Sequence, residues 1–527
     1  METSHRLKRA AKGNRRITQA PGTTYHGKTV KVYFFLCGLG ALSVRFLRLF
    51  MKPTIMKFGG TSVEGATAFK NAAGIVFDRK ALRPVVVVSA MAGFTDALIQ
   101  SVQQSLTVGA DAGADSLEKH FDRHLRVIDA LLVSEAGRML QLIDQSRVEI
   151  KALLKTAAAE VGDDRKRRRF FADAIVSYGE RLSAALLAAV LLENKVVSRA
   201  VDARRCVITD DDHGCATPLM PVTFAKTRQE LEPLIESSCV PVLGGFIGST
   251  LTGETTTLGR GGSDYTAALI GAALAASEIQ IWTDVPGVLT ADPRLVAHAR
   301  TVPHLSFEEA AELAYFGAKV LHPKTLHPAI ERDIPVRICN SRAQEGGSTL
   351  VVGESKKSPQ TVKAIAHKTG VTTVQITSTR MLGAYGFLRA IFAVFADHKT
   401  AVDVVTTSEV SVSLSLDDTT SLAEIIAELG KLGSVTIEEK RAILCVVGEG
   451  LRTTPGIAAR IFSTISDINV SLISQGASRI NLTFAVEEDR VRETVMRLHR
   501  EFFEETENHQ SDAIAGTAVS AAPTLSY

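Results

Sequence analysis

Cysteine is scarce in this sequence, and the cysteines that occur have no spacing typical of a site. Six of them, at positions 37, 206, 215, 239, 339 and 445, are spread over 527 residues without a Cys-x-x-Cys pair. This argues against a disulfide framework and a zinc site, and it favours reduced thiols. The sequence also lacks a Walker-type phosphate loop, so any nucleotide site must be built from other motifs.

Outside the first fifty residues, positive and negative side chains nearly balance. The formal net charge is +3, but residues 1–50 carry ten Lys and Arg against the single acid Glu2, which leaves residues 51–527 at −6. A mildly acidic body argues against nucleic acid as a partner. The apolar run at 32–44 is too short to span a membrane. We therefore expect a cytoplasmic protein without a nucleic-acid or membrane partner.

The basic segment 1–50 allows three interpretations: a targeting segment, an uncharacterised extension, or sequence translated from a wrongly assigned start. We favour the last, because Met51 or Met56 would begin the chain at the first strand. The length of its apolar run is near that of a signal-peptide core, so organellar or membrane targeting stays open.

Residues 51–352 alternate short apolar strands with helices, as a parallel sheet covered on both faces does. The predicted strands are 54–58, 84–89, 196–202, 240–244, 278–283 and 335–340. The predicted helices are 66–77, 117–154, 170–192, 264–276 and 306–316. We expect an α/β three-layer sandwich whose ligands bind beyond the carboxyl ends of the strands.

A change of composition near residue 353 marks a linker, 353–363, before two similar α+β units. The first unit spans 364–440, with strands at 371–378, 401–406 and 409–416 and a helix at 386–398. The second spans 441–505, with strands at 442–448, 469–475 and 479–486 and a helix at 456–466. We expect a tandem repeat, and a disordered tail at 506–527.

The motif Lys57-Phe58-Gly59-Gly60-Thr61-Ser62 follows the first predicted strand. Paired glycines let backbone N–H groups approach phosphate oxygens, and the lysine ammonium supplies a positive charge. Phosphoryl transfer requires such cations and N–H groups around the moving phosphoryl group. An ordinary turn with a solvated lysine is the alternative.

Arg260-Gly261-Gly262-Ser263-Asp264 precedes a predicted helix, which Ser263 or Asp264 could cap. Arginine suits a bidentate contact with a carboxylate, and Asp264 suits an ammonium group. This pair predicts a small amino acid as substrate. Glu180, which we place near the start of a helix, would either complement the helix dipole or add a second acid beside that ammonium.

Two further segments follow strands or helices in the same region. Residues 283–294 offer hydroxyls, a carboxylate and an arginine after the strand at 278–283, which suits the ribose and phosphates of a nucleotide. Residues 316–323 add Lys319 after a glycine, whereas we expect His322 to be structural.

Six ordered motifs together resemble the aspartate kinases of the amino-acid kinase superfamily. They are KFGGTS (57–62), SAMAGFT (89–95), SYGE (177–180), GRGGSDYTA (259–267), WTDVPGVLTADPR (282–294) and FGAKVLHP (316–323). The resemblance implies that the γ-phosphoryl group of ATP is transferred to the β-carboxylate of L-aspartate, giving 4-phospho-L-aspartate. This reaction opens the biosynthesis of lysine, threonine, methionine and, in bacteria, diaminopimelate.

The resemblance also implies roles for individual residues. Lys57 and Asp264 are expected to be catalytic. The expected aspartate site comprises Thr95, Glu180, Arg260, Ser263 and Asp264. The expected ATP site comprises Lys57, Gly59, Gly60, Ser62, Thr283, Asp284, Arg294, Lys319 and Val320. Mg²⁺ would be carried by the phosphates rather than by a protein cage. Some relatives have a tyrosine where this chain has Leu289, so an aromatic contact with the nucleotide is absent there.

The tandem units resemble ACT domains, which bind amino acids and regulate enzymes. The segments 381–388, 401–403 and 406–409 resemble the lysine-inhibited type, although serines of some lysine-sensitive relatives are replaced by Ala384 and Ala401. The expected effector site comprises Met381, Gly386, Phe387, Leu388, Val402, Asp403, Thr407, Ser408 and Glu409. Lysine is the expected effector and threonine the alternative, and a homodimer or homotetramer through the ACT domains is expected.

Two other functions remain open at this stage. The chain could phosphorylate another amino-acid carboxylate, such as glutamate or its N-acetyl derivative, or it could be a catalytically silent amino-acid sensor. The SYGE and GRGGSD motifs argue against the first, and the presence of Lys57, Arg260 and Asp264 argues against the second.

Overall fold

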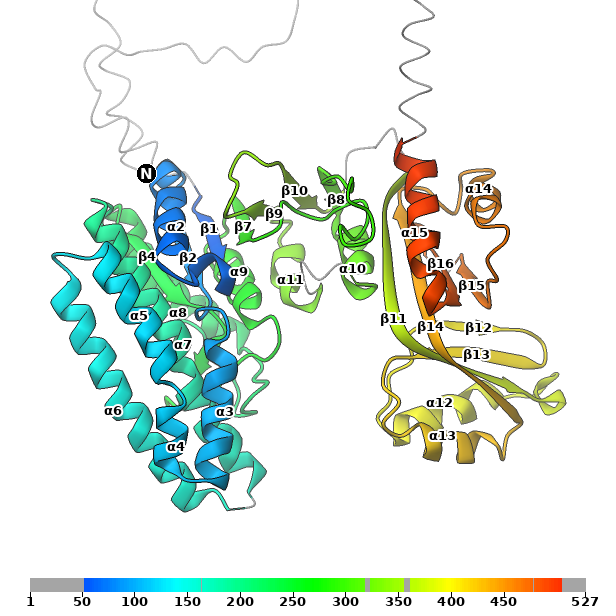
Figure 1. Cartoon of the computed structure of the whole chain (residues 1–527), viewed down its shortest axis with the longest axis horizontal. Helices are drawn as coiled ribbons and strands as arrows, with labels where there is room; N and C mark the ends of the chain where they lie inside the picture. Colours follow the sequence, from blue (N-terminus) through cyan, green and yellow to red (C-terminus); the bar gives the residue numbers. More distant parts are fainter. Residues whose placement is uncertain (1–51, 163, 318–322, 355–360, 477, 505–527) are drawn as a thin grey trace, which may run out of the picture. The chain divides into compact units, whose positions relative to one another are not determined.

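A computed structural model of the chain describes residues 52–162, 164–317, 323–354, 361–476 and 478–504 (Figure 1). The basic segment 1–50 and the tail 506–527 lie outside the described residues, and so do Lys319, Val320 and His322.

An eight-stranded sheet organises the first part of the chain, and its order is β3-β4-β2-β1-β7-β9-β10-β8. Its strands are β1 (Thr54–Phe58), β2 (Pro84–Val88), β3 (Ser198–Val201), β4 (Val240–Gly244), β7 (Glu278–Thr283), β8 (His304–Ser306), β9 (Val336–Asn340) and β10 (Ser348–Val352). The strands from β3 to β9 are parallel, whereas β10 is antiparallel to β9. The predicted mainly parallel sheet is therefore confirmed.

Helices cover both faces of this sheet, as its wholly buried strands require. Because side chains alternate along a strand, Met56 and Phe58 enter one core and Ile55 enters the other. The first core packs against α2 (Ala66–Asp78), α3 (Phe94–Thr107), α5 (Glu118–Leu131), α6 (Ala136–Glu160) and α7 (Arg165–Glu193). The second packs against α8 (Met220–Glu236), α9 (Gly262–Ala273), α10 (Phe307–Tyr315) and α11 (Pro323–Ile330). This is the predicted three-layer sandwich.

This part also contains three smaller elements that lie near the site or the core. They are the 3-10 turn η1 (Gly60–Val63), helix α4 (Ala110–Asp115) and the hairpin of β5 (Ile247–Ser249) and β6 (Thr255–Thr257).

The prediction of one helix over 117–154 is wrong, because the chain breaks between α5 and α6. Glu193, at the end of α7, fixes the break by accepting hydrogen bonds from the backbone N–H groups of Val133 and Glu135, both at 2.9 Å. These bonds satisfy N–H groups at the start of α6, which a continuous helix would pair internally. Helix α7 also begins earlier than predicted, because Asp164 caps it by accepting from the N–H groups of Lys166 and Arg167.

Helix α7 is the one described helix long and apolar enough to cross a membrane. It lies in the core instead, since 89% of its apolar window is buried inside the protein. Its apolar character therefore has a sufficient explanation in packing against the sheet.

A six-stranded antiparallel sheet organises the second part, in the order β12-β13-β11-β14-β16-β15. Its strands are β11 (Val362–Thr377), β12 (Val405–Thr407), β13 (Ser411–Leu416), β14 (Ser434–Gly448), β15 (Leu472–Gln475) and β16 (Asn481–Glu487). Its helices are α12 (Phe387–Asp397), α13 (Leu422–Leu429), α14 (Ile457–Thr464) and α15 (Val491–His499), which is followed by a π-helical turn, η6 (Arg500–Glu504).

Two strands, β11 and β14, run through both repeat units. The first half of β11 pairs with the second half of β14 beside β16, and the second half of β11 pairs with β13 and the start of β14. The pairing shifts register between Lys368 and Val371, where the strands pass from one unit to the other. The predicted boundary at 440/441 thus falls inside a shared strand, and β11 begins within the predicted linker 353–363. Helices α13 and α15 were not predicted.

Candidate active site

The carboxyl ends of β1, β2, β4 and the start of α9 meet in a closed ring of contacts. Lys57 of β1 contacts Asp264 of α9, and the loop after β1 contacts the loop after β2. That second loop contacts α7, which contacts the end of β4, and the end of β4 returns to α9. The sequence-distant motifs are thereby brought to one place, as expected at this edge of a parallel sheet.

Lys57 and Asp264 form the charged pair at the centre of the ring. The Lys57 Nζ lies 2.7 Å from the Asp264 Oδ1, and the two side chains are only 11% and 15% exposed. Lys57 projects from the fourth position of β1, between Val87 and Ile281 of the neighbouring strands. Solvent screens such a pair far less than a surface ion pair, so each charge strongly orients the other.

The loop after β1 is packed too closely for side chains at its second glycine. A Cβ atom on Gly60 would lie 2.9 Å from the Ala90 carbonyl oxygen in the loop after β2. The Ala92 N–H also donates to the Gly60 carbonyl oxygen at 3.2 Å. Glycine therefore allows the KFGGTS and SAMAGFT segments to lie backbone against backbone.

Glu180 lies in the middle of α7, so the interpretation that it complements the helix N-terminus is wrong. Its Oε1 accepts a hydrogen bond from the Ala90 N–H at 3.2 Å. Its Oε2 is buried and has no hydrogen-bond partner among the described residues. Burial raises the pKa of Glu180 to about 8, and the hydrogen bond from Ala90 acts in the opposite direction. A buried acid with a free oxygen is ready to receive a cationic group.

Ser263 lies in the first turn of α9 but does not cap it, contrary to the sequence interpretation. The capping residue is Gly261, in the left-handed region at φ 75°, and it makes no side-chain cap. Ser263 instead packs on the end of β4, because a Cβ atom on Gly245 would lie 2.7 Å from the Ser263 Cβ.

Arg260 directly precedes Gly261 at the start of α9, and Thr95 lies at the start of α3, after the loop that follows β2. Arg260 is exposed, and its side chain makes no hydrogen bond or ion pair with any residue that the structure describes. Thr95 is the second residue of α3 and is half-buried, after the left-handed Gly93 at φ 77°. An unpaired guanidinium at Arg260 and a buried acid at Glu180 would together suit a ligand carrying both a carboxylate and an ammonium group.

Part of the expected nucleotide side is tied to the same ring. The Gly59 N–H donates to the Trp282 carbonyl oxygen at 3.0 Å, and the Ser62 hydroxyl donates to the same oxygen at 3.2 Å. Ser62 also shares a hydrogen bond of 2.7 Å with Ser341, which sequence analysis missed. Thr283 and Asp284 follow directly, where the Thr283 hydroxyl donates to Asp284 Oδ1 at 3.2 Å.

The rest of that side is a loop in which Asp284 and Arg294 are exposed, whereas Val288, Thr290 and Ala291 are buried. Arg294 pairs with Asp292, with its Nη2 at 2.6 Å from the Asp292 Oδ2, and its own side chain is 83% exposed. This pairing lowers the pKa of the Asp292 carboxyl. Leu289 is half-buried and its backbone bridges to Thr301.

Sequence analysis also missed the turn Gly244-Gly245-Phe246 at the end of β4. A Cβ atom on Gly244 would lie 2.9 Å from the Glu180 backbone, so this turn positions both Glu180 and Ser263. Phe246 has a φ of 68°, which is strained for an aromatic residue and is held by a bond from its N–H to the Thr266 hydroxyl at 3.0 Å. The sequence feature that could have indicated this turn is the glycine pair at the end of the predicted strand 240–244.

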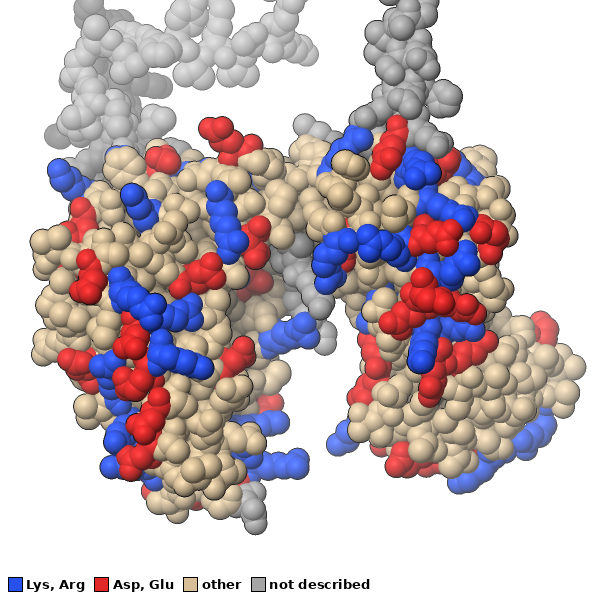
Figure 2. Space-filling model, in the orientation of Figure 1, with Lys and Arg blue, Asp and Glu red and all other residues tan. Residues whose placement is uncertain are grey.

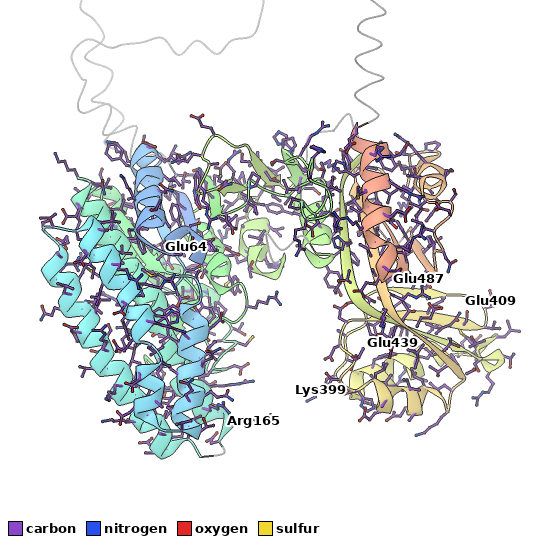
Figure 3. The ribbon with its side chains drawn as sticks, viewed as in Figure 1. Glu64, Arg165, Lys399, Glu409, Glu439 and Glu487 are labelled. Atoms are coloured by element: carbon purple, nitrogen blue, oxygen red, sulfur yellow. The ribbon has the colours of Figure 1, made fainter. Side chains whose placement is uncertain are left out.

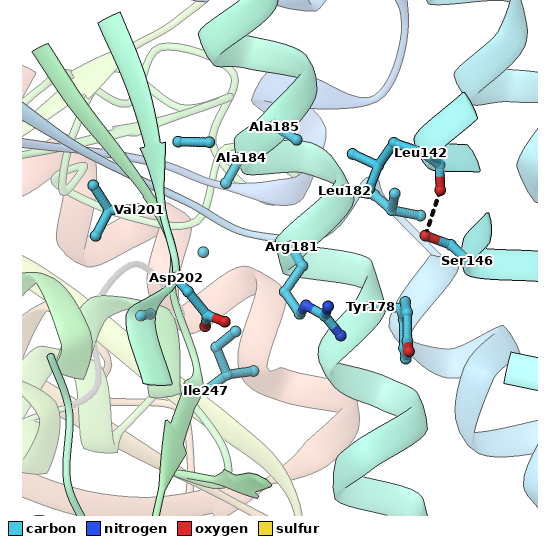
Figure 4. A pocket seen from close by; sticks show the side chains of 13 residues that line it. Leu142, Ser146, Tyr178, Arg181, Leu182, Ala184, Ala185, Val201, Asp202 and Ile247 are labelled. Carbon is cyan, nitrogen blue, oxygen red and sulfur yellow. Dashed lines mark hydrogen bonds between the residues drawn. The ribbon is translucent and has the colours of Figure 1, made fainter. Parts of the chain in front are cut away.

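A separate cavity of about 210 Å³ lies between α6, α7 and β3 (Figure 4). Arg181 and Tyr178 line it from α7, and Asp202 lines it from the end of β3. None of the predicted site residues lines it, although Gly244, at the end of β4, belongs both to its lining and to the ring.

The expected effector residues lie around the start of α12 and along β12. Gly386 caps α12 at φ 81°, and Met381, Phe387 and Leu388 flank it. Glu409 is exposed in the turn between β12 and β13 (Figure 3). The remaining expected positions are Val402, Asp403, Thr407 and Ser408.

Asp403, expected in the effector site, already has partners in the structure. Its Oδ2 lies 3.3 Å from the Lys368 Nζ of β11, and its Oδ1 accepts a hydrogen bond from the Tyr315 hydroxyl of α10. Lys368 also pairs with Asp417. Any ammonium group that reaches Asp403 must therefore share or displace these partners.

No group of three or more acidic, histidine or cysteine side chains suited to a metal occurs among the described residues. On the face shown in Figure 2, Lys and Arg alternate with Asp and Glu over α5 and α6. Ion pairs in this region include Arg147–Glu118, between α6 and α5, and Lys151–Asp111, between α6 and α4. Charges of both signs thus mix on this face.

Comparison with known proteins matches residues 52–340 to the amino acid kinase family and residues 444–502 to an ACT domain. Lysine-sensitive aspartokinase 3 of Escherichia coli (strain K12) is 38% identical over 460 residues, which cover 85% of this chain and 99% of that protein. The chloroplastic aspartokinase 1 of Arabidopsis thaliana is 37% identical over 465 residues, covering 85% of this chain and 80% of that protein.

Solved structures agree with these relatives. E. coli aspartokinase III in complex with aspartate and ADP (R-state) matches with a TM-score of 0.73 and 36% identity, over 86% of this chain and 100% of that one. The same enzyme in complex with lysine and aspartate (T-state) matches with a TM-score of 0.71 at the same identity and coverage. The motifs, the ring that unites them and these matches lead to one assignment: the chain belongs to the aspartokinases, within the amino acid kinase family.

Proposed function

We propose that this aspartokinase transfers the γ-phosphoryl group of ATP to the β-carboxylate of L-aspartate within the ring described above. The observation that carries the proposal is the meeting of the Lys57–Asp264 pair with a buried, half-satisfied Glu180. A zwitterion with a second carboxylate needs a cation, an anion and a path to the phosphoryl group, and the ring offers all three.

Each charged residue of the ring has a separate role in this proposal. The exposed Arg260 binds a substrate carboxylate, and the free Oε2 of Glu180 accepts from the substrate ammonium. Asp264 orients the Lys57 ammonium, which stabilises the negative charge of the moving phosphoryl group. Ser263 and Thr95, on the first turns of α9 and α3, complete the expected aspartate site.

ATP fits the glycine-rich side of the ring. Gly60 packs closely against the loop after β2. Gly59 and Ser62 connect this loop to Trp282 of β7, and Thr283 and Asp284 come directly after Trp282. Mg²⁺ would reach the site on the phosphates, because no described acidic cluster could cage it. When bound, the ion neutralises phosphate charge, and Lys57 acts on the charge that remains.

The test is an initial-rate assay of ADP formation with aspartate, glutamate or N-acetylglutamate as acceptor. We expect kcat/KM for aspartate to exceed that for glutamate by about a hundredfold or more, since an added methylene misplaces the reacting carboxylate. Higher turnover with glutamate would overturn the substrate assignment, and no turnover with any acceptor would favour the non-catalytic sensor.

We propose lysine as the feedback effector, bound by the residues around α12 and β12. Two findings about the E. coli relative support this: aspartokinase 3 is named lysine-sensitive, and a solved structure of aspartokinase III is a complex with lysine. Glu409 is exposed and pairs with no described residue, so it offers an ammonium group a free carboxylate. At Asp403 the incoming ammonium would compete with Lys368.

Glu409→Ala is the test of that site. It should weaken lysine inhibition about tenfold and leave kcat without effector unchanged, because the effector and active sites are separate and only coupled. Glu439→Ala is the matched control, since Glu439 is also an exposed glutamate of the same region (Figure 3). Equal lysine sensitivity of Glu409→Ala and the parent enzyme would refute the site, and selective inhibition by threonine would refute the effector.

We also propose a homodimer or homotetramer formed through the ACT region. Four apolar side chains near the start of α12 are exposed: Leu382 by 65%, Tyr385 by 105%, Leu388 by 41% and Phe392 by 38%. A patch of this kind favours burial against another chain. Light scattering should show a smaller particle for Tyr385→Ser with Leu388→Ser, but not for Val148→Ser on α6, which is 70% exposed.

The cytoplasm is the proposed location, with segment 1–50 dispensable. The chain without residues 1–50 should match the full chain in kcat and in lysine inhibition. A loss of activity in the shortened chain would instead assign that segment a role in the enzyme.

A further inference from the structure

Asp173 is a buried carboxylate that the reaction itself does not use. It lies on α7, seven residues before Glu180 and therefore about two helical turns away on the same face. Its side chain is 4% exposed, and burial raises its pKa. A carboxylate kept inside a protein must be compensated by donors that it holds in place.

Asp173 is compensated by donors from two separate segments. Its Oδ1 accepts from the Thr257 hydroxyl at 2.6 Å, and its Oδ2 accepts from the Thr257 N–H at 3.1 Å. The same Oδ2 accepts from the Gly214 N–H at 2.9 Å and lies 3.1 Å from the His213 Nδ1. One carboxylate thus clamps the last residue of β6 and the loop 213–214 to α7.

Both clamped segments lead to the residue before Arg260. Thr257 is two positions before Gly259 along the chain. The clamped loop reaches Gly259 through space, because a Cβ atom there would lie 3.3 Å from the Cys215 Sγ and 3.4 Å from the Gly214 carbonyl oxygen. Gly259 itself is left-handed at φ 73°, so the direction in which the chain leaves for Arg260 is fixed at this point.

Arg260 needs such support, since its own side chain has no described partner. A free guanidinium on a loose loop would lose much of its affinity to the cost of ordering it. A guanidinium on a backbone held from two sides is preorganised instead.

We propose that Asp173 is a positioning residue for Arg260: by clamping Thr257 and loop 213–215 around Gly259, it holds the guanidinium where it meets the carboxylate of the amino-acid substrate. This rests on the proposed role of Arg260. One face of α7 then serves the substrate at both ends, with Glu180 at the ammonium and Asp173, through Arg260, at the carboxylate.

Asp173→Asn is the first test, because an amide cannot accept from three N–H groups and a hydroxyl at once. We expect KM for aspartate to rise about tenfold, with kcat and KM for ATP changed less than about twofold. Asp210→Asn is the matched control, since among the described residues the Asp210 side chain bonds within the same loop, to the N–H groups of Asp212 and Thr217. A merely structural role would change kcat and both KM values together.

Thr257 supplies a milder second test in case Asp173→Asn does not fold. Thr257→Val removes the hydroxyl donor and should raise KM for aspartate about threefold, whereas Thr257→Ser keeps the donor and should restore the parent value. Equal KM values for aspartate in the valine and serine variants would overturn the proposal.

A double-mutant cycle with Arg260→Ala distinguishes the positioning role of Asp173 from the substrate-binding role of Arg260. If Asp173 acts through Arg260, Asp173→Asn or Thr257→Val should raise KM for aspartate no further in the Arg260→Ala background. If the two effects multiply fully, the positioning role is wrong although Arg260 still binds substrate. If Arg260→Ala leaves KM for aspartate unchanged, the proposed role of Arg260 fails first.

Discussion

The aspartate side and the nucleotide side of the active site differ in how far they are preorganised before a ligand binds. On the aspartate side, Lys57 and Asp264 are paired and mostly buried, and Glu180 is wholly enclosed. On the nucleotide side, Asp284 is exposed and Arg294 is 83% exposed and bonded to its neighbour Asp292. The aspartate side has charges fixed in the core, with Arg260 exposed beside them in sequence, whereas the charged side chains of the nucleotide side are exposed on a loop whose Thr290 and Ala291 are buried.

This difference has a physical meaning for catalysis. Charges that are fixed and shielded from water act on a transition state without reorganising, so the buried side should account for most of the rate enhancement. Exposed charges are screened and must first leave their present partners, so the loop side should contribute modestly to nucleotide affinity. Substitutions on the two sides should therefore differ in size and in which constant they change.

The largest effect is expected for Lys57→Ala. Loss of its ammonium removes a shielded charge from the phosphoryl group and leaves Asp264 buried without its partner, so kcat should fall at least about a hundredfold. Steady-state kinetics measures this. Lys70→Ala, which removes an exposed lysine of α2, is the control and should leave kcat unchanged. Near-normal turnover of Lys57→Ala would show that the buried charges do not account for most of the rate enhancement.

The next effect concerns the pH dependence of aspartate binding. Burial raises the pKa of Glu180 to about 8, so near neutral pH its carboxyl is mostly protonated and must release a proton to pair with an ammonium group. KM for aspartate should therefore fall about tenfold between about pH 6.5 and 8.5. Glu180→Gln, which cannot ionise, should show a high KM that is nearly constant over this range.

The same shift makes a statement about stability with a definite sign. Because the folded state holds the Glu180 proton at higher pH than the unfolded state does, this group favours folding less as pH rises from about 4.5 toward 8. Glu180→Gln should therefore raise the melting temperature more at about pH 8.5 than at about pH 6. A KM or a melting difference that is flat with pH would contradict the burial of an ionisable Glu180.

The buried side was also the more predictable from sequence. Lys57, Gly60, Glu180 and Asp264 could be placed because each follows a strand of apolar residues or lies on an apolar helix, and such patterns specify position. The errors there were local. The start of α7 was placed too late because its first turn is purely basic, and Glu180 was placed near a helix start although it lies in the middle of α7.

Contacts between distant segments were beyond the sequence. Nothing in the strand pattern pairs Asp403 with Lys368 and Tyr315, since those three residues come from different elements. The break between α5 and α6 depends on Glu193, almost sixty residues later in the chain. The sharing of β11 and β14 between the ACT units likewise requires pairing over long separations, which local patterns do not encode.

On the nucleotide side, Arg294→Ala should have a smaller and different effect. Because the guanidinium is solvent-screened and already bonded to Asp292, its loss should raise KM for ATP about fivefold and leave KM for aspartate unchanged. Arg126→Ala, an exposed arginine of α5, is the control. A fall in kcat as large as that of Lys57→Ala would erase the distinction between the two sides.

The smallest expected effect is a gain at Leu289. This half-buried residue lies in the same loop, five positions before Arg294, and offers a nucleotide no aromatic surface. Leu289→Tyr adds such a surface, whose stacking is worth about 0.5–1.5 kcal/mol beyond area burial, so KM for ATP should fall about threefold. Leu289→Met, which keeps the volume without the ring, should leave it unchanged. Since Leu289 is only half-buried, the added ring can improve nucleotide affinity without altering the Lys57–Asp264 pair, and kcat should stay constant. A change in kcat with an unchanged KM for ATP would mean that this loop, too, acts on the transferring phosphoryl group.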